Sequence, residues 1–258
     1  MYEEIISQSI LFAVSFTANL FASVSGGGAG FVQFPLLILM GLPFATALGT
    51  HKVAVVFLGL GALSKKFKDK GNFDIDKQIA LIMLFIGCPA VVAGTIIVVS
   101  VDPDVAAFVV GIITILSGIY TFYKKSFGGN NLENRSLQRT IIGSILMIII
   151  GMFSGSLSSG AGLFSTLTLV LVFGLDLKRA ILHTMVFVAT IWNAVGAITV
   201  GALTSIYWQW VPVLIIATFL GSYIGTTLLI KLNVKFVRIC FSSVAILSGL
   251  TLLYTLVS

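Results

Sequence analysis

Charged residues are scarce in this sequence, and that scarcity limits the class of protein. Only 9% of its 258 residues are Asp, Glu, Lys or Arg, against roughly 25% in an ordinary soluble domain. Apolar residues make up 58% of the chain, and the mean hydropathy is +1.11. A soluble core of this size cannot enclose so much apolar surface. The composition therefore excludes a soluble protein and predicts an integral membrane protein.

Carboxylates are missing from the interior of the apolar runs. A proton relay or a cation site built from carboxylates within the membrane is therefore disfavoured, as is an intramembrane aspartyl or metallo-hydrolase. The Walker A, HExxH and GxSxG motifs are also absent. We expect no enzymatic activity, no metal and no cofactor, and transport driven by a gradient rather than by ATP bound to this chain. The nine acids lie at run ends or in loops, at Glu3, Glu4, Asp69, Asp74, Asp76, Asp102, Asp104, Glu133 and Asp176.

Cysteine is nearly absent as well. The two cysteines, Cys88 and Cys240, lie inside apolar runs at positions that do not correspond in the two halves of the chain. Two such residues are better interpreted as small buried core residues than as a redox or metal pair.

Long apolar runs account for most of the sequence. They are continuous rather than alternating, which favours spanning helices and excludes a β-barrel. Most approach the roughly 20 residues that a spanning helix requires, but 30–41 and 162–174 do not. The runs cover about 5–24, 30–41, 44–63, 78–100, 104–123, 140–157, 162–174, 180–199, 206–231 and 236–257.

The sequence is duplicated. Gly-Ala-Gly at 28–30 recurs at 160–162, and Ile-Leu-Ser-Gly at 115–118 recurs at 246–249. The repeat spacing is about 131 to 133 residues. Internal repeats whose flanking charges invert are typical of membrane transporters.

Basic residues gather in alternate loops, which predicts the topology. Loops 64–77 and 124–139 are rich in Lys and Arg and are expected to lie in the cytoplasm. The expected location of the protein is the inner (cytoplasmic) membrane of the cell. Links 174–179 and 231–238 are basic too, whereas 101–104 and 200–209 carry no base. This topology explains the net charge of +6 without a nucleic-acid partner. Residues 1–4 hold Glu3 and Glu4 instead of the basic region of a signal peptide, so we expect the first apolar run to be retained in the protein and residues 1–4 to lie outside the cell.

These assignments fit together in one way. Stretch 140–174 begins and ends inside and stretch 5–41 begins and ends outside, so each is a re-entrant hairpin followed by three spanning helices. The fold class is therefore an all-α membrane protein of two inverted-topology repeats, 1–125 and 140–258, joined by a cytoplasmic linker at 126–139. The return limbs, at 1.5 Å per residue, reach roughly 18–20 Å, short of the roughly 30 Å hydrocarbon core, so the hairpin tips are expected at depth.

The hairpin tips carry the candidate substrate site. The first tip, 23–31, contains Ser25, Gly26, Gly27 and Gly28; the second, 154–162, contains Ser158, Ser159 and Gly160. Non-helical backbone at membrane depth is tolerated only where it is buried in protein or lines a water-filled cavity. Glycines allow the main chain close to a ligand, and helix N-termini after each tip would attract an anion. The alternative is plain helix packing through small residues.

A second candidate cluster lies near the start of the next helix in each half. Lys52 is the one Lys or Arg well inside an apolar run, where a charge is costly and usually functional. The repeat aligns Thr50 with His183 and His51 with Thr184. Lys52 could balance an anionic substrate, and His51 and His183 could bind substrate or carry a proton. Snorkelling, a backbone carbonyl at a helix end, or ordinary packing are the alternatives.

Other features are weaker. Gln33, Asn19, Trp192 and Asn193 lie at plausible cavity depth. The small-residue motifs Gly87 to Gly94 and Gly221 to Gly225 can pack helices within one chain or between chains, so the oligomeric state stays open.

Several motifs together resemble the TauE/SafE sulfite exporter family. They are the glycine-rich run 26–37 with Pro35, Gly-Leu-Pro at 41–43, Ala-Leu-Gly-Thr at 47–50 and Lys-Gly-Asn-Phe-Asp at 70–74. Length, duplication and the second tip agree, so the likeness covers nearly the whole chain. The chain departs from the family pattern in the serines of its second tip, at His51 and Lys52, and at Leu182-His183 in place of Gly-Thr.

The resemblance implies movement of sulfite, thiosulfate or an organosulfonate such as sulfoacetate. Combined with the anion site expected at the tips, it favours a secondary transporter that works by alternating access in a lipid bilayer, with export as the expected direction. The alternatives are an anion channel with the tips as filter, and a lipid-phosphate flippase.

Overall fold

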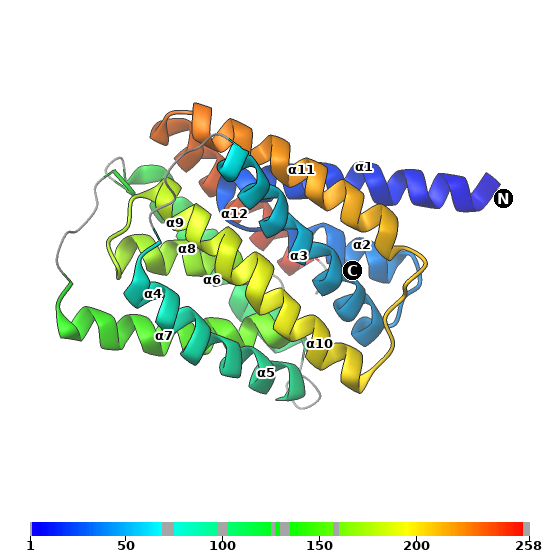
Figure 1. Cartoon of the computed structure of the whole chain (residues 1–258), viewed down its shortest axis with the longest axis horizontal. Helices are drawn as coiled ribbons and strands as arrows, with labels where there is room; N and C mark the ends of the chain where they lie inside the picture. The colour runs from blue at the N-terminus through cyan, green and yellow to red at the C-terminus, as the bar shows by residue number, and fades with distance from the viewer. Residues whose placement is uncertain are drawn as a thin grey trace.

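The computed structural model describes residues 2–68, 75–97, 103–124, 127–129, 135–156 and 160–254, and within these ranges it contains helices and no strand (Figure 1). The all-helical membrane protein expected from composition is confirmed. In the described residues, seven helices are long and apolar enough to cross a membrane: Glu4–Ser25, Phe44–Lys65, Lys77–Ile97, Leu137–Ser156, Leu177–Leu203, Val211–Lys231 and Val234–Thr251.

The order of elements is the same in the two parts of the chain: a long helix, a short helix, then three long ones. The first part contains α1 (Tyr2–Ser25), η1 (Ala29–Phe31), α2 (Gln33–Leu39), α3 (Phe44–Lys68), α4 (Lys77–Ile82), η2 (Met83–Gly87), α5 (Cys88–Ile97) and α6 (Pro103–Tyr123). The second contains α7 (Leu137–Ser156), α8 (Ala161–Leu171), α9 (Leu177–Thr184), η3 (Met185–Trp192), α10 (Asn193–Leu203), α11 (Val211–Lys231) and α12 (Val234–Tyr254). Segments α4, η2 and α5 are continuous, as are α9, η3 and α10.

The short return limbs occur where the sequence predicts them. The expected 30–41 and 162–174 correspond to the helical segments Ala29–Leu39 and Ala161–Leu171. The α1–α2 hairpin opens at the end of the molecule that holds the N-terminus, and the α7–α8 hairpin opens at the opposite end (Figure 1). The first turns of α1 extend beyond the neighbouring helices, so its last turns lie among them.

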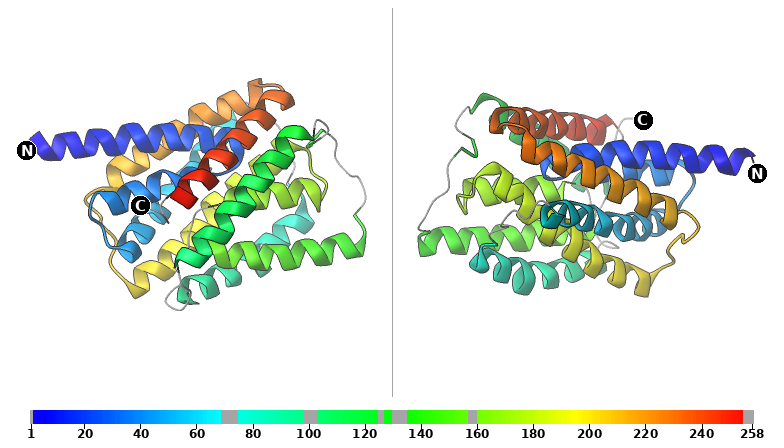
Figure 2. Two further views of the ribbon diagram at one scale, coloured as in Figure 1. Left: turned by 180° about the vertical axis from the view of Figure 1, so that it is seen from behind. Right: turned by 45° about the horizontal axis from the view of Figure 1, so that its top comes forward.

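Helix pairs between the two parts of the chain mirror one another. Helix α1 packs on α11 and, in the corresponding way, α7 packs on α5. Helix α3 packs on α11 as α10 packs on α5, and α3 also lies against η3 and α10. Helices α6 and α12 pack on each other (Figure 2). The core is therefore built largely from contacts between helices of the two parts of the chain, and α3 and α9–α10 lie at its centre.

Small residues set these crossings. A Cβ on Gly221 of α11 would lie 2.4 Å from the carbonyl oxygen of Phe16, and one on Gly225 would lie 2.3 Å from that of Leu20. A Cβ on Gly94 of α5 would lie 2.1 Å from the carbonyl oxygen of Met152. The two small-residue motifs therefore pack helices within this chain, because only glycine lets the backbones approach so closely.

A π-helical turn receives the largest fully buried side chain. The indole Nε1 of Trp192 donates to the Met83 carbonyl at 2.8 Å, where the wider π-turn begins. The ring fills the space beside Gly87, since a Cβ there would lie 2.1 Å from it. The indole N–H thus satisfies a buried carbonyl at the contact between η2 and η3.

Replacing Trp192 with phenylalanine is expected to lower the free energy of unfolding by on the order of 2–3 kcal/mol, because it leaves the Met83 carbonyl without its donor and opens a void. Thermal unfolding of the detergent-solubilised protein measures this loss of stability. Trp208→Phe is the matched control, because Trp208 is 64% exposed; equal losses in both variants would contradict the prediction.

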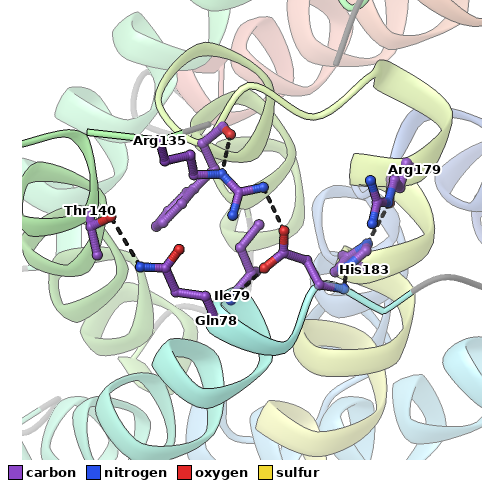
Figure 3. A network of polar contacts seen from close by, with 8 residues as sticks. Gln78, Ile79, Arg135, Thr140, Arg179 and His183 are labelled. Atoms are coloured by element: carbon purple, nitrogen blue, oxygen red, sulfur yellow. Dashed lines mark hydrogen bonds and ion pairs between the residues drawn. The ribbon is translucent and has the colours of Figure 1, made fainter. Parts of the chain in front are cut away.

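At the end of the molecule where α4, α7 and α9 begin, here called the basic end because Lys77, Arg135 and Lys178 lie there, a polar network joins both parts of the chain (Figure 3). Arg135 donates to the Asp76 carboxylate at 2.6 Å and to the Phe173 carbonyl at 2.5 Å. Asp76 caps α4 by accepting from Ile79 N–H at 3.1 Å, and its own N–H donates to Nε2 of His183 at 3.0 Å. The network fixes the starts of α4 and α7 against α8 and α9.

Breaking the Asp76–Arg135 ion pair is expected to destabilise the protein. Partial burial acts to raise the pKa of Asp76, but hydrogen bonds from Arg135 and Ile79 and the Arg135 charge outweigh it and hold the pKa below 3.8. A lowered pKa means that the stabilisation is complete above pH 3.8 and is lost as pH falls through the lowered value. Asp76→Asn keeps the cap and should cost about 2 kcal/mol at neutral pH.

Thermal unfolding of Asp76→Asn, Arg135→Gln and the double variant separates the pair from other effects. The double variant should lose less than the two single losses added together, because the partners share one interaction. Strict additivity would contradict a direct pair.

Candidate functional site

The two hairpin tips meet in the interior of the molecule. A Cβ on Gly27 would lie 2.6 Å from the backbone nitrogen of Leu163, and one on Gly162 would lie 2.8 Å from the carbonyl oxygen of Gly26. The hydroxyl of Thr166, on α8, donates to that same carbonyl at 3.2 Å. The main chains of the tips are therefore in direct contact, which requires glycine on both sides.

The glycines of the tips also adopt backbone conformations that other residues avoid. Gly26, Gly27 and Gly28 have φ values of +80°, +155° and +104°, and Gly160 has +82°. Three such residues in succession end α1 and turn the chain into η1, and Gly160 precedes α8. The hydroxyl of Ser25 lies 2.8 Å from the carbonyls of Phe21 and Gly27, so it closes this turn.

A small cavity of about 40 Å³ lies between the tips. Its lining comes from the tips, α1, α3, α7, α9, η3 and α10. The described residues around it include no carboxylate. They are Ala22, Gly26, Gly27, Gly28, Ala29, Gly30, His51, Val55, Leu58, Ser154, Gly160, Ala161, Gly162, Thr184, Met185, Val188, Ala189 and Asn193.

The two tips contribute different groups to the cavity. The second tip presents the N-terminus of α8, whose first N–H groups have no acceptor within the helix and whose dipole is positive there. After the first tip the chain enters the three-residue 3₁₀ turn η1 instead of an α-helix. The predicted pair of facing helix N-termini is therefore one α-helix N-terminus facing a glycine loop.

His51 lines the cavity and is 1% exposed. Its Nδ1 lies 3.1 Å from Oε1 of Gln33 on α2. Gln33 in turn donates to Ser15 of α1 at 3.2 Å and to Thr218 of α11 at 3.4 Å. The ring is thus positioned by a hydrogen-bond chain across three helices.

Lys52 is fully buried but lies behind the cavity wall. Its Nζ donates to the Ser154 carbonyl at 2.5 Å, and its stem lies beside Gly196, where a Cβ would approach Cδ to 3.0 Å. Ser154 is in the last turn of α7, where carbonyls lack intrahelical donors and the helix dipole is negative. The structure therefore places the Lys52 charge at a helix end that forms part of the cavity wall.

The two threonines have different surroundings. Thr184 lines the cavity, and its hydroxyl lies 2.9 Å from that of Thr166. Thr50 lies outside the cavity lining: it donates to the Thr46 carbonyl at 2.7 Å and accepts from Tyr207 N–H at 2.9 Å. Thr50 therefore links α3 to the segment between α10 and α11.

His183 belongs to the polar network at the basic end, not to the cavity lining. Its Nδ1 lies 2.8 Å from the Arg179 carbonyl, and its Nε2 accepts from Asp76 N–H. These partners engage both ring nitrogens (Figure 3). Ser158 and Ser159 lie outside the described residues.

The structure brings together Gly26, Gly27, Gly28, His51, Gly160 and Thr184 around the cavity. Thr166 and Thr218, which sequence reasoning did not single out, take part in the hydrogen bonds that support it. Their one signal is that each is a polar residue in an apolar run, and many threonines in this chain share that signal.

Comparison with known proteins identifies the family. The model described as "Sulfite exporter TauE/SafE" matches residues 11–252. The "Probable membrane transporter protein" of Haemophilus influenzae is 28% identical over 179 residues, covering 69% of this chain and 68% of its own. The "Probable membrane transporter protein YfcA" of Escherichia coli K12 is 27% identical over 250 residues, covering 95% and 89%.

The "Probable membrane transporter protein YdhB" of Bacillus subtilis is 26% identical over 219 residues, covering 82% of this chain and 87% of its own. No solved structure matches the chain. The family match spans nearly the whole sequence and agrees with the motifs of the first tip. The chain therefore belongs to the TauE/SafE sulfite exporter family and is a multi-pass membrane transporter, not an enzyme.

Proposed function

We propose that this protein is a secondary transporter of a small sulfur-containing anion, and that the cavity between the tips is its substrate site. The observation that carries the proposal is the cavity itself: its lining includes no carboxylate among the described residues, and the N-terminus of α8 lies at it. A helix N-terminus favours an anion through free N–H groups and a positive dipole. The proposed ligands are Gly26, Gly27, Gly28, Gly160, His51 and Thr184, with Lys52 as counter-charge.

The mirrored packing supports alternating access between two inverted repeats, 1–125 and 140–258, around this site. In the proposed topology the basic end, with Lys77, Arg135 and Lys178, faces the cytoplasm. The hairpins open at opposite ends of the molecule, as inverted repeats would (Figure 1). Because the two tips contact each other, the proposed site lies between the two proposed repeats.

Export is the proposed direction. A membrane potential that is negative inside favours efflux of an anion by about 2.3 kcal/mol per charge per 100 mV, so efflux needs no coupling ion. Uptake would need a co-transported cation or proton, for which His51 is the group at the cavity.

Binding to a panel of anions tests the proposal: sulfite, thiosulfate, sulfate, sulfoacetate, taurine, phosphate and chloride. Thermal shift of the purified full chain screens the panel, and titration calorimetry follows. We expect selective stabilisation by a sulfur anion, and saturating flux with counterflow in proteoliposomes. Ohmic currents would instead identify a channel, and binding of lipid phosphate without any sulfur anion would identify a flippase.

A further inference from the structure

The tautomer of His51 is set by its neighbour in the first hairpin. Gln33 donates through its amide nitrogen to Ser15 and Thr218, so its oxygen faces Nδ1 of His51 at 3.1 Å. An amide oxygen only accepts, so Nδ1 carries the hydrogen of this bond. In the neutral ring the lone pair is then on Nε2.

Nε2 is the ring nitrogen left for the cavity. His51 is buried and lines the cavity, and no group within the described part of the chain hydrogen-bonds its Nε2. The other polar side chains around it are engaged: the Thr184 hydroxyl with Thr166 at 2.9 Å, and Asn193, which donates to the Val188 carbonyl at 2.9 Å. An acceptor beside the cavity with no donor among these groups is matched best by a ligand that supplies the hydrogen.

This acceptor imposes a condition on the anion. A fully deprotonated oxyanion would place an oxygen lone pair against the nitrogen lone pair of His51. An anion that keeps one proton offers a donor to Nε2 and acceptors to the N–H groups at the start of α8. We propose that the cavity binds a small oxyanion in its singly protonated form, with its O–H donating to Nε2 of His51. For a sulfur anion the species is hydrogensulfite.

The charge beside the cavity agrees with a monoanion. Lys52, next to His51 on α3, is fully buried and supplies one ammonium group. The side chains that reach the His51 network from α1, α2 and α11 are uncharged: Ser15, Asn19, Gln33 and Thr218. Among the described lining side chains, His51 is the titratable one. One buried positive charge compensates one negative charge better than two.

The size of the cavity narrows the ligand further. One water requires at least about 10–15 Å³, so 40 Å³ is roughly three such volumes. A space of this size favours a compact oxyanion over the longer chain of sulfoacetate or taurine. The inference rests on the proposed function and specifies which species that site takes.

The first test uses the wild-type chain. Calorimetric affinity for total sulfite is measured across the pH range in which hydrogensulfite loses its proton, with methanesulfonate as a monoanion that keeps no proton. Affinity for total sulfite should fall about tenfold per pH unit above that transition, because binding follows the hydrogensulfite fraction. Methanesulfonate should bind at least tenfold more weakly, and any binding should change little with pH, which excludes titration of the site.

The second test uses two variants of His51. His51→Gln keeps an acceptor and should retain sulfite binding within a few fold. His51→Leu removes the acceptor and should lose at least tenfold and lose the preference over methanesulfonate. Size-exclusion chromatography confirms folding, and the wild-type measurements stand even where a variant does not fold.

Two results would overturn the inference and leave the proposed function standing. One is sulfite affinity that is flat or rises with pH, and the other is methanesulfonate binding equal to sulfite. Absence of binding by every sulfur anion at every pH would overturn the proposed function and the inference with it.

Discussion

Replacing Gly27 with alanine is expected to abolish anion binding and to lower the apparent melting temperature by roughly 10 °C, which corresponds to about 3 kcal/mol. The new Cβ would lie 2.6 Å from the backbone nitrogen of Leu163 and 2.8 Å from the carbonyl carbon of Gly162. Neither is the end of a flexible side chain, so the tips must move apart, at about 1–3 kcal/mol for overpacking. The φ value of +155° adds backbone strain.

Gly41→Ala is the matched control. Gly41 also has a left-handed φ, +96°, but a Cβ there would meet nothing within 4 Å. Gly41→Ala should therefore lower the free energy of unfolding only by the backbone strain, about 1 kcal/mol, and leave anion binding intact. Thermal unfolding and calorimetry on both variants separate strain from collision. Equal effects of the two substitutions would show that the close contact between the tips is not the reason why glycine is required at position 27.

The sequence predicts the helices and the tips well, because a bilayer imposes simple rules on both. Spans must be long and apolar, so the runs give the helices. The short segments Ala29–Leu39 and Ala161–Leu171 stand out because they are too short to span. The Gly-Ala-Gly duplication marks both tips, since close backbone approach excludes larger residues.

The partners of polar side chains are less predictable. Repeat spacing places His183 opposite Thr50 and suggests a role at the substrate site, but its ring contacts Asp76, a residue that precedes α4. That contact depends on how the starts of α4 and α9 pack, which periodicity within one helix does not encode. The sequence likewise predicts that Lys52 lies deep in the membrane, but it does not predict which group accepts its hydrogen bond. That group is the Ser154 carbonyl, which belongs to another helix.

The contact between Lys52 and Ser154 leads to the second large effect. The ammonium satisfies a carbonyl in the last turn of α7 and places its positive charge behind a residue that lines the cavity. Burying a charge among apolar helices is costly, and stability alone gives little reason to keep it there. Its attraction for an anion in a low-dielectric cavity supplies a reason.

Lys52→Met is therefore expected to weaken sulfite binding by tenfold to hundredfold, about 1–3 kcal/mol, while changing the melting temperature little. Stability should change little because the lost hydrogen bond and the relieved desolvation of the charge oppose each other. Calorimetry measures the affinity and thermal unfolding measures the stability of the same sample. Lys65→Met, on the same helix but away from the cavity lining, should leave the affinity unchanged. Unchanged affinity in Lys52→Met would reduce Lys52 to a support for the end of α7.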